Sequence, residues 1–149
     1  MEKFCFPLSN MEIESITRAA GLSDFYVKEK NTPEFIRSLG KIMPCSGNAL
    51  RKCFPAQGSH NRLKTDIHGN CTFLGPQGCR LDSYVRPLYC RIYPFWFSKG
   101  KLTFLKDPGC LAQQETASIK ILLSLFHADP GELCTMFSTM LNNLGLETR

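Results

Sequence analysis

The chain has 149 residues, of which 43% are hydrophobic and 21% charged, and this composition excludes a disordered or low-complexity protein. Its net charge of +5 comes from 18 basic and 13 acidic side chains spread along the chain. That excess fits an anionic ligand or weak nucleic-acid contact but specifies neither, and we do not expect nucleic acid to be a partner. No apolar run is long enough to cross a bilayer, and residues 1–7 do not have the pattern of a signal peptide. We therefore expect a single cytoplasmic domain over residues 1–149, with no membrane partner and with any protein partner unidentified.

The N-terminal third predicts two helices. Ser9 and Glu12 have the spacing of a capping box, apolar residues follow at helical intervals, and Gly21 provides the stop. A second, shorter helix is expected after Thr32, with a proline at its first position and Gly40 beyond its end.

Between Lys41 and Cys110 the pattern changes to glycine, proline and short apolar pieces. Two hairpins are predicted, each with a glycine-containing turn. Their strands are expected at 63–67 and 71–74, and at 95–97 and 102–105. The segment between the hairpins is irregular, apart from one helical turn begun by Pro87.

The C-terminal third predicts two more helices. One runs from Gln113 to His127, and the other begins at Pro130 and ends at Gly145. A tight turn joins them, so they are expected to form an antiparallel pair. The predicted fold class is a small, helix-rich α+β domain with one or two hairpins around an irregular cysteine-rich centre.

Eight cysteines are the main chemical feature of the chain. In a cytoplasmic protein they are metal ligands, redox thiols or buried small side chains more often than disulfides. Cys71, Cys79 and Cys90 share one loop-like segment, and Cys110 follows the second predicted hairpin. No C-x-x-C occurs and the spacings match no standard zinc motif. Spacing alone therefore leaves a metal site and simple core packing equally open.

The string C-x-F-L-x5-C-x-L-x4-R-P-x2-C-R-x-Y-P, from Cys71 to Pro94, resembles the bacterial cysteine-cluster family of zinc- or iron-chelating domains. Its specific element is R-P-x-x-C-R-x-Y-P, and Phe6-Pro7-Leu8-Ser9 with Glu12 also resembles the entry to the family's first helix. The resemblance implies a metal site made by Cys71, Cys79, Cys90 and Cys110, and hence a zinc or iron cofactor, the latter as an iron–sulfur cluster.

The chain departs from the family pattern at its N-terminus. The family has C-x-x-C-x-x-C-C there, whereas only Cys5 remains here, aligned with the last of those cysteines; either three ligands are lost or the true start lies upstream. Cys5 is the first reserve ligand, and Cys45 and Cys53 are weaker candidates for replacing lost ones. Cys134 is expected in the core. Flagellin lysine-N-methylases share a comparable cluster, but no methyl-donor motif is present to carry that activity over.

Other polar residues have two interpretations each. Arg86 and Arg91 flank Cys90, where they could stabilise a negatively charged thiolate centre and so contact the cofactor. They could equally form ordinary salt bridges, to Asp82 or Asp107.

The three isolated histidines at 60, 68 and 127 are not expected to be ligands. The aromatic run 93–97 is expected to be core that shields the metal rather than a base-stacking surface.

The leading hypothesis is therefore a metal-binding protein that holds one zinc ion or iron–sulfur cluster through clustered thiolates, in a structural or redox role. One alternative is a protein-modifying or redox enzyme that uses the centre, with a pocket beside Arg91. The other is a metal-free interaction domain in which the cluster has decayed. Whether the chain is an enzyme stays open at this point.

Overall fold

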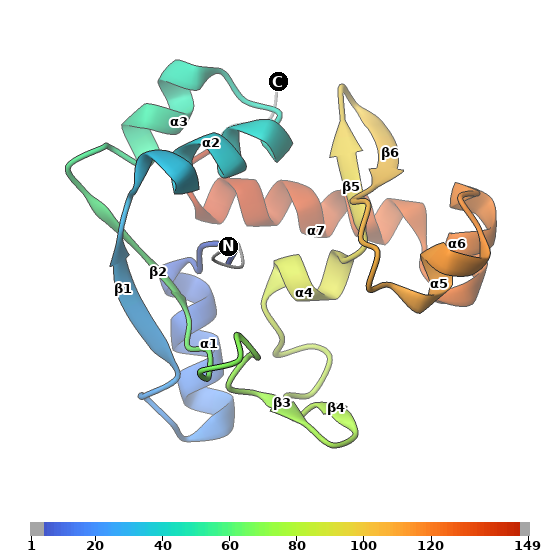
Figure 1. Ribbon diagram of the computed structural model, residues 1–149, viewed down its shortest axis with the longest axis horizontal. Coiled ribbons are helices and arrows are strands. Elements are labelled where there is room, and N and C mark those ends of the chain that lie inside the picture. Colours follow the sequence, from blue (N-terminus) through green and yellow to red (C-terminus); the bar gives the residue numbers. More distant parts are fainter. Residues whose placement is uncertain (1–4, 147–149) are drawn as a thin grey trace.

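The computed structural model describes residues 5–146. The prediction that residues 1–7 are not a signal peptide falls partly on residues 1–4, which lie outside the described residues. Within residues 5–146 the chain forms an α+β fold with three separate two-stranded antiparallel sheets (Figure 1). The helices are α1 Asn10–Ala20, α2 Pro33–Ile42, α3 Gly47–Cys53, α4 Leu88–Ile92, α5 Leu111–Glu115, α6 Ile119–Leu125 and α7 Pro130–Asn143. The strands are β1 Tyr26–Lys30, β2 Ser59–Leu63, β3 Leu74–Gly75, β4 Gly78–Cys79, β5 Phe95–Ser98 and β6 Lys101–Phe104. The predicted fold class is confirmed.

The predicted start and end of α1 are confirmed. The Ser9 hydroxyl accepts a hydrogen bond from the Glu12 amide at 3.2 Å, and the Glu12 carboxylate accepts one from the Ser9 amide at 2.9 Å. Gly21 follows the helix with φ of 66°, a left-handed conformation that costs glycine little. This capping box fixes the direction in which the N-terminal segment enters the helix.

The second helix begins as predicted but ends later. Thr32 caps α2, yet the helix continues through Gly40 and stops only before Met43-Pro44, because the residue before a proline avoids the helical region. Helix α3, capped by Ser46, was not predicted. Its seven residues are too few for a helical period to stand out in the sequence.

The first predicted hairpin is wrong. Strand β2 pairs with the distant β1, in register from Tyr26↔Leu63 to Lys30↔Ser59, while the expected 63–67/71–74 pairing is reduced to a single bridge between Thr65 and Cys71. The Asp66 carboxylate organises the intervening turn by accepting amide hydrogen bonds, including one from His68 at 2.8 Å. A shorter hairpin, β3–β4, follows it.

The second hairpin and the helical turn are confirmed. Strands β5 and β6 pair around Lys99-Gly100, which both have positive φ. Helix α4 follows Pro87. The carbonyl of Pro87 accepts the first helical hydrogen bond, from the Arg91 amide at 3.0 Å.

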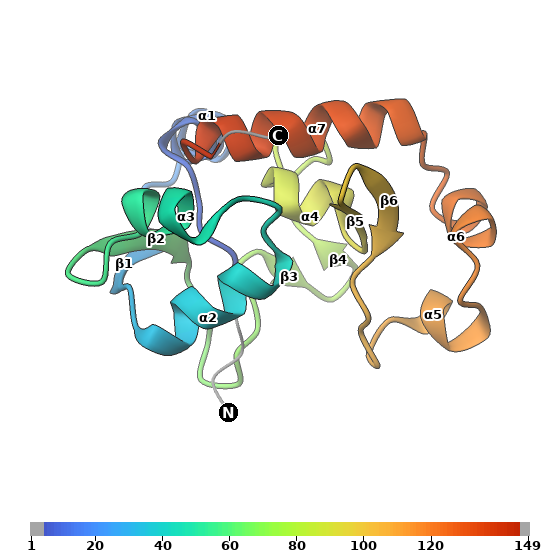
Figure 2. The same ribbon diagram turned by 90° about the horizontal axis from the view of Figure 1, so that it is seen from above.

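The predicted Gln113–His127 helix is two helices. The hydroxyl of Thr116 accepts a hydrogen bond from the Ser118 amide, and the hydroxyl of Ser118 then caps α6. These local bonds compete with helical ones, so α5 ends at Glu115 and α6 begins at Ile119. The sequence predicts that the last two helices pack against each other as an antiparallel pair. In the structure α7 instead packs chiefly on α4 and β5 (Figure 2).

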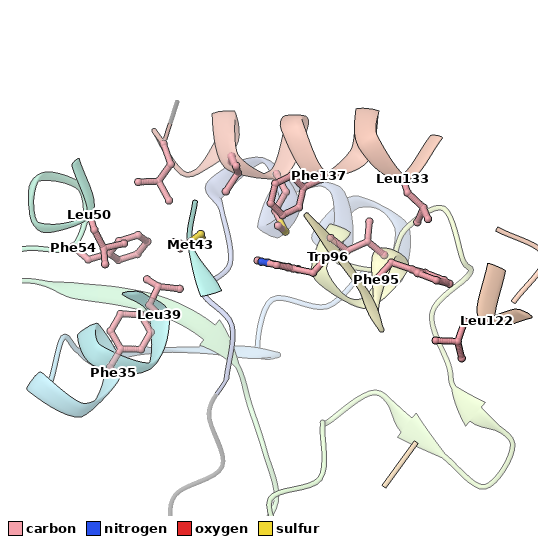
Figure 3. Close-up of a cluster of buried hydrophobic side chains, with 14 residues drawn as sticks. Phe35, Leu39, Met43, Leu50, Phe54, Phe95, Trp96, Leu122, Leu133 and Phe137 are labelled. Atoms are coloured by element: carbon pink, nitrogen blue, oxygen red, sulfur yellow. The ribbon is translucent and has the colours of Figure 1, made fainter. Parts of the chain in front are cut away.

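Two groups of buried side chains support this fold. The larger joins α2, α3, α4, β5, α6 and α7, with Trp96 and Phe137 at its middle (Figure 3). The smaller contains Phe25 and Phe73 and packs α1 against the β3–β4 region. The aromatic run is core as predicted, whereas Cys134 is exposed on α7, so the prediction that it is buried is wrong. Within the described residues, no helix has the length and hydrophobicity needed to traverse a bilayer.

Candidate metal centre

Cys71 and Cys79 are held together by the β3–β4 hairpin. The carbonyl of Cys71 accepts a hydrogen bond from the Leu74 amide at 2.9 Å, and Leu74 is paired with Cys79 across the hairpin. Both cysteines are half-buried free thiols that pack against the smaller core group, beside residues such as Phe73. The local chain therefore keeps these two thiols close together.

Arg86 connects this hairpin to the helix that carries Cys90. Its guanidinium donates to the carbonyl of Leu81 at 3.0 Å and to that of Cys79 at 3.5 Å. Four residues later, Cys90 lies on α4. Arg86 directly precedes Pro87, which caps α4. Its hydrogen bond to the carbonyl of Cys79 in β4 therefore limits how far α4 can move from the hairpin.

An aromatic stack brings the N-terminal segment to the same place. The rings of Phe6 and Tyr89 are parallel within 8°, with centroids 4.5 Å apart. Phe6 follows Cys5 and Tyr89 precedes Cys90. The stack therefore holds the backbones of Cys5 and Cys90 near each other, although 85 residues of chain separate them.

The electrostatics of the thiols agree with this arrangement. Burial raises the pKa of Cys71, and negative charge on Cys79 or Cys5 raises it further. Burial also raises the pKa of Cys90 to about 12, with added effects of Cys71 and Cys79 and an opposing effect of Arg86. Cys90 is an exposed residue, so the effect of burial on its pKa comes from the protein that surrounds it on its other sides. Because Coulombic effects decline with distance, Cys5, Cys71, Cys79 and Cys90 share one neighbourhood.

Cys110 lies beside Asp107 and Tyr93. Its amide donates to the carbonyl of Asp107 at 3.1 Å, and the Tyr93 hydroxyl donates to the carboxylate of the same Asp107. Burial raises the pKa of Tyr93 well above its usual range, with further contributions from Asp107 and Cys110. Negative charge on Cys90, Asp107 and Cys5 also adds to the effect of burial in raising the pKa of Tyr89, so Cys110 adjoins a carboxylate that acts on the same tyrosine as Cys5 and Cys90.

Cys45 and Cys53 belong to the opposite end of the molecule. They flank α3, which lies far from β3–β4 (Figure 1). The Cys53 thiol donates to the carbonyl of Gly145 at 3.2 Å, and burial raises the pKa of Cys45. Neither is placed to replace a missing ligand at the centre.

The two candidate arginines differ. Arg86 is half-buried and only partly offsets the effects that raise the pKa of Cys90. Arg91 is exposed on α4. The described hydrogen bonds of Arg86 go to main-chain carbonyls rather than to the carboxylate of Asp82.

The donor set fits a soft metal, because four cysteine side chains share one neighbourhood and thiolates select zinc and iron–sulfur clusters. In the described chain, however, no three cysteine, histidine or acidic side chains are already arranged to hold an ion. Their side chains would have to turn inward to ligate one. Ligation would also displace the thiol protons, so metal affinity should fall with falling pH.

The sequence did not identify Phe6 and Tyr89 as part of the site. Phe6 is next to the only cysteine of the N-terminal segment, and Tyr89 lies inside the R-P-x-x-C-R motif. An aromatic residue beside a cysteine in two distant segments is the signal that could have suggested their contact. It is a weak signal, because aromatic residues are common in any core.

A cavity of about 500 Å³ adjoins Cys5 rather than Arg91. Its wall includes His60, Arg62 and Glu29, and the last two form an ion pair across the β1–β2 ribbon. His60 is 7% exposed, stacks on Phe35 with centroids 3.7 Å apart and shares a hydrogen bond of 2.7 Å with Asn31.

The burial of His60 predicts a pH dependence of stability. Burial lowers its pKa from 6.5, so the folded state binds the proton less readily than the unfolded state. The stabilising contribution is complete above pH 6.5 and is lost as pH falls toward the lower folded pKa. Urea unfolding of the wild type should therefore weaken from pH 7.5 to pH 5 by more than unfolding of His60→Gln. Equal losses in the two proteins would contradict this assignment.

Comparison of the chain with family models, with curated proteins and with solved structures gives no match.

Proposed function

We propose that this protein binds one metal centre, a zinc ion or an iron–sulfur cluster, through the thiolates of Cys5, Cys71, Cys79 and Cys90. The observation that carries the proposal is the convergence of three chain segments. The β3–β4 hairpin joins Cys71 to Cys79, and the stack of Phe6 on Tyr89 adds Cys5 and Cys90. Cys110, beside Asp107, is the reserve ligand in this assignment.

The chemistry of such a centre follows from its donors. Four thiolates on a divalent ion carry a net negative charge, which the nearby guanidinium of Arg86 would offset. A centre closed by four protein ligands has no position for substrate, so its role is structural or electron-transferring. The protein supplies the ligands and buries them in part. It also places Arg86 where its positive charge lowers the energetic cost of holding a negatively charged centre.

The cavity beside Cys5 favours one second candidate, a redox or protein-modifying enzyme. A catalytic zinc keeps one position open for water or substrate. If Cys71, Cys79 and Cys90 were the permanent ligands, the cavity would give substrate access from the side of Cys5. This candidate predicts three sulfur ligands and one lighter atom on the metal.

Anaerobic purification tests the proposal. We expect the protein to retain about one zinc ion and be colourless, or to be brown and contain both iron and sulfide. Elemental analysis and visible absorption distinguish these results. Protein that contains neither metal, and takes up neither on reconstitution, would support the metal-free interaction domain and overturn the proposal.

A further inference from the structure

We propose that Glu12 is a positioning residue for the metal centre, because its one carboxylate holds together the two chain segments that carry Cys5 and Cys90. This inference rests on the proposed metal-binding function. Glu12 is half-buried in the first turn of α1, and its side chain has partners on two elements.

One carboxylate oxygen is used at the N-terminus. It accepts hydrogen bonds from the Ser9 amide at 2.9 Å and from the Ser9 hydroxyl at 3.1 Å. These bonds fix the backbone where the segment containing Cys5 enters α1. Leu8 immediately before it is also held, through a backbone hydrogen bond of 2.8 Å from its amide to the carbonyl of Asn61.

The other oxygen reaches a helix 76 residues away. It accepts a hydrogen bond of 2.9 Å from the amide of Leu88, the first residue of α4. Pro87 precedes that helix and has no side-chain acceptor of its own, so Glu12 supplies the missing partner. Cys90 is two residues further along, in the same helical turn.

This bridge acts beside the stack of Phe6 on Tyr89. The stack holds side chains together, whereas Glu12 fixes the two backbones. A metal centre gains affinity when its ligands are already near their bound positions, since less conformational freedom is lost on binding. Groups that orient metal ligands typically change metal affinity 10- to 100-fold when removed. Glu12 is expected to act in that range without touching the metal.

The test uses cobalt(II), whose visible spectrum reports thiolate ligation, with the full-length protein under anaerobic conditions. Glu12→Ala should bind cobalt(II) roughly 10- to 100-fold more weakly than wild type. Its bands should also change in position or intensity as the ligand geometry loosens. Glu12→Gln keeps one carboxamide oxygen, which can accept from the Leu88 amide or from the Ser9 amide but not from both, so it should recover only part of the affinity.

Asp129→Ala is the matched control. Asp129 caps α7 by accepting a hydrogen bond of 2.9 Å from the Glu132 amide, so its loss removes the cap of a helix that carries none of the four proposed ligands. This variant should lose stability but keep the wild-type cobalt affinity and spectrum. If Glu12→Ala binds cobalt as Asp129→Ala does, Glu12 is only a helix cap and the inference is overturned.

Two further outcomes are distinguishable. A wild-type protein that binds no cobalt would overturn the proposed function itself, and the inference with it. If Glu12→Ala does not fold, Glu12→Gln decides: an intermediate loss of cobalt affinity supports the bridge, and either unchanged affinity or a loss as large as that of a ligand mutant contradicts the positioning role.

Discussion

Replacing Cys90 by serine is expected to weaken metal binding by on the order of 100-fold. Structural zinc sites contribute roughly 10–16 kcal/mol, so each of four thiolates accounts for about 3 kcal/mol, which corresponds to that factor. Cys90 should be particularly sensitive, because it lies between the stack at Tyr89 and the thiols of the hairpin. Cobalt(II) or zinc affinity, measured with a competing chelator, gives the result.

Two cysteine variants make this prediction specific. Cys134→Ser changes an exposed thiol on α7 and should leave affinity unchanged. Cys110→Ser should change it little, because the described neighbours of Cys110 are Tyr93 and Asp107. A hundredfold loss in Cys110→Ser together with normal affinity in Cys5→Ser would reverse the ligand assignment and restore the set implied by the family resemblance.

Replacing Trp96 by alanine is expected to lower the free energy of unfolding by about 3–5 kcal/mol. Trp96 is 2% exposed, its indole nitrogen donates to the carbonyl of Ile42 at 2.6 Å, and its ring contacts Phe137 edge-on at 4.9 Å. Loss of the ring opens a cavity at the middle of the larger core group and leaves a carbonyl without its partner. Single domains are stabilised by only about 5–15 kcal/mol, so this variant should be close to unfolding.

Urea unfolding followed by circular dichroism measures this effect. Trp96→Phe keeps an aromatic ring but no donor, and should lose less. Tyr84→Ala removes a ring that is 73% exposed and should change stability by no more than about 0.5 kcal/mol. A loss in Trp96→Ala no larger than that of Tyr84→Ala would show that the core is not organised around the indole.

The sequence predicts the elements whose signals are local. The capping box at Ser9, the Pro87 turn and the β5–β6 hairpin each depend on a few neighbouring residues, and each is confirmed. The pairing of β1 with β2 depends on residues 29 to 37 positions apart, and neither strand has a strict alternation. The break at Thr116 depends on a local hydroxyl bond that competes with an otherwise continuous apolar pattern.

The candidate site divides in the same way. Cys71, Cys79 and Cys90 are in one segment, so their grouping follows from the sequence. The choice between Cys5 and Cys110 does not, because it depends on a ring stack between distant segments and on where the chain turns after β6. Glu12 is visible in the sequence as a capping residue, but its bond to Leu88 is a tertiary contact.

X-ray absorption at the zinc edge of the zinc-loaded protein tests the central claim most directly. We predict four sulfur ligands at about 2.3 Å in the wild type and in Cys110→Ser, and three sulfurs with one oxygen or nitrogen in Cys5→Ser. Three sulfurs and a lighter atom already present in the wild type would contradict a closed four-thiolate centre and support the enzyme candidate instead.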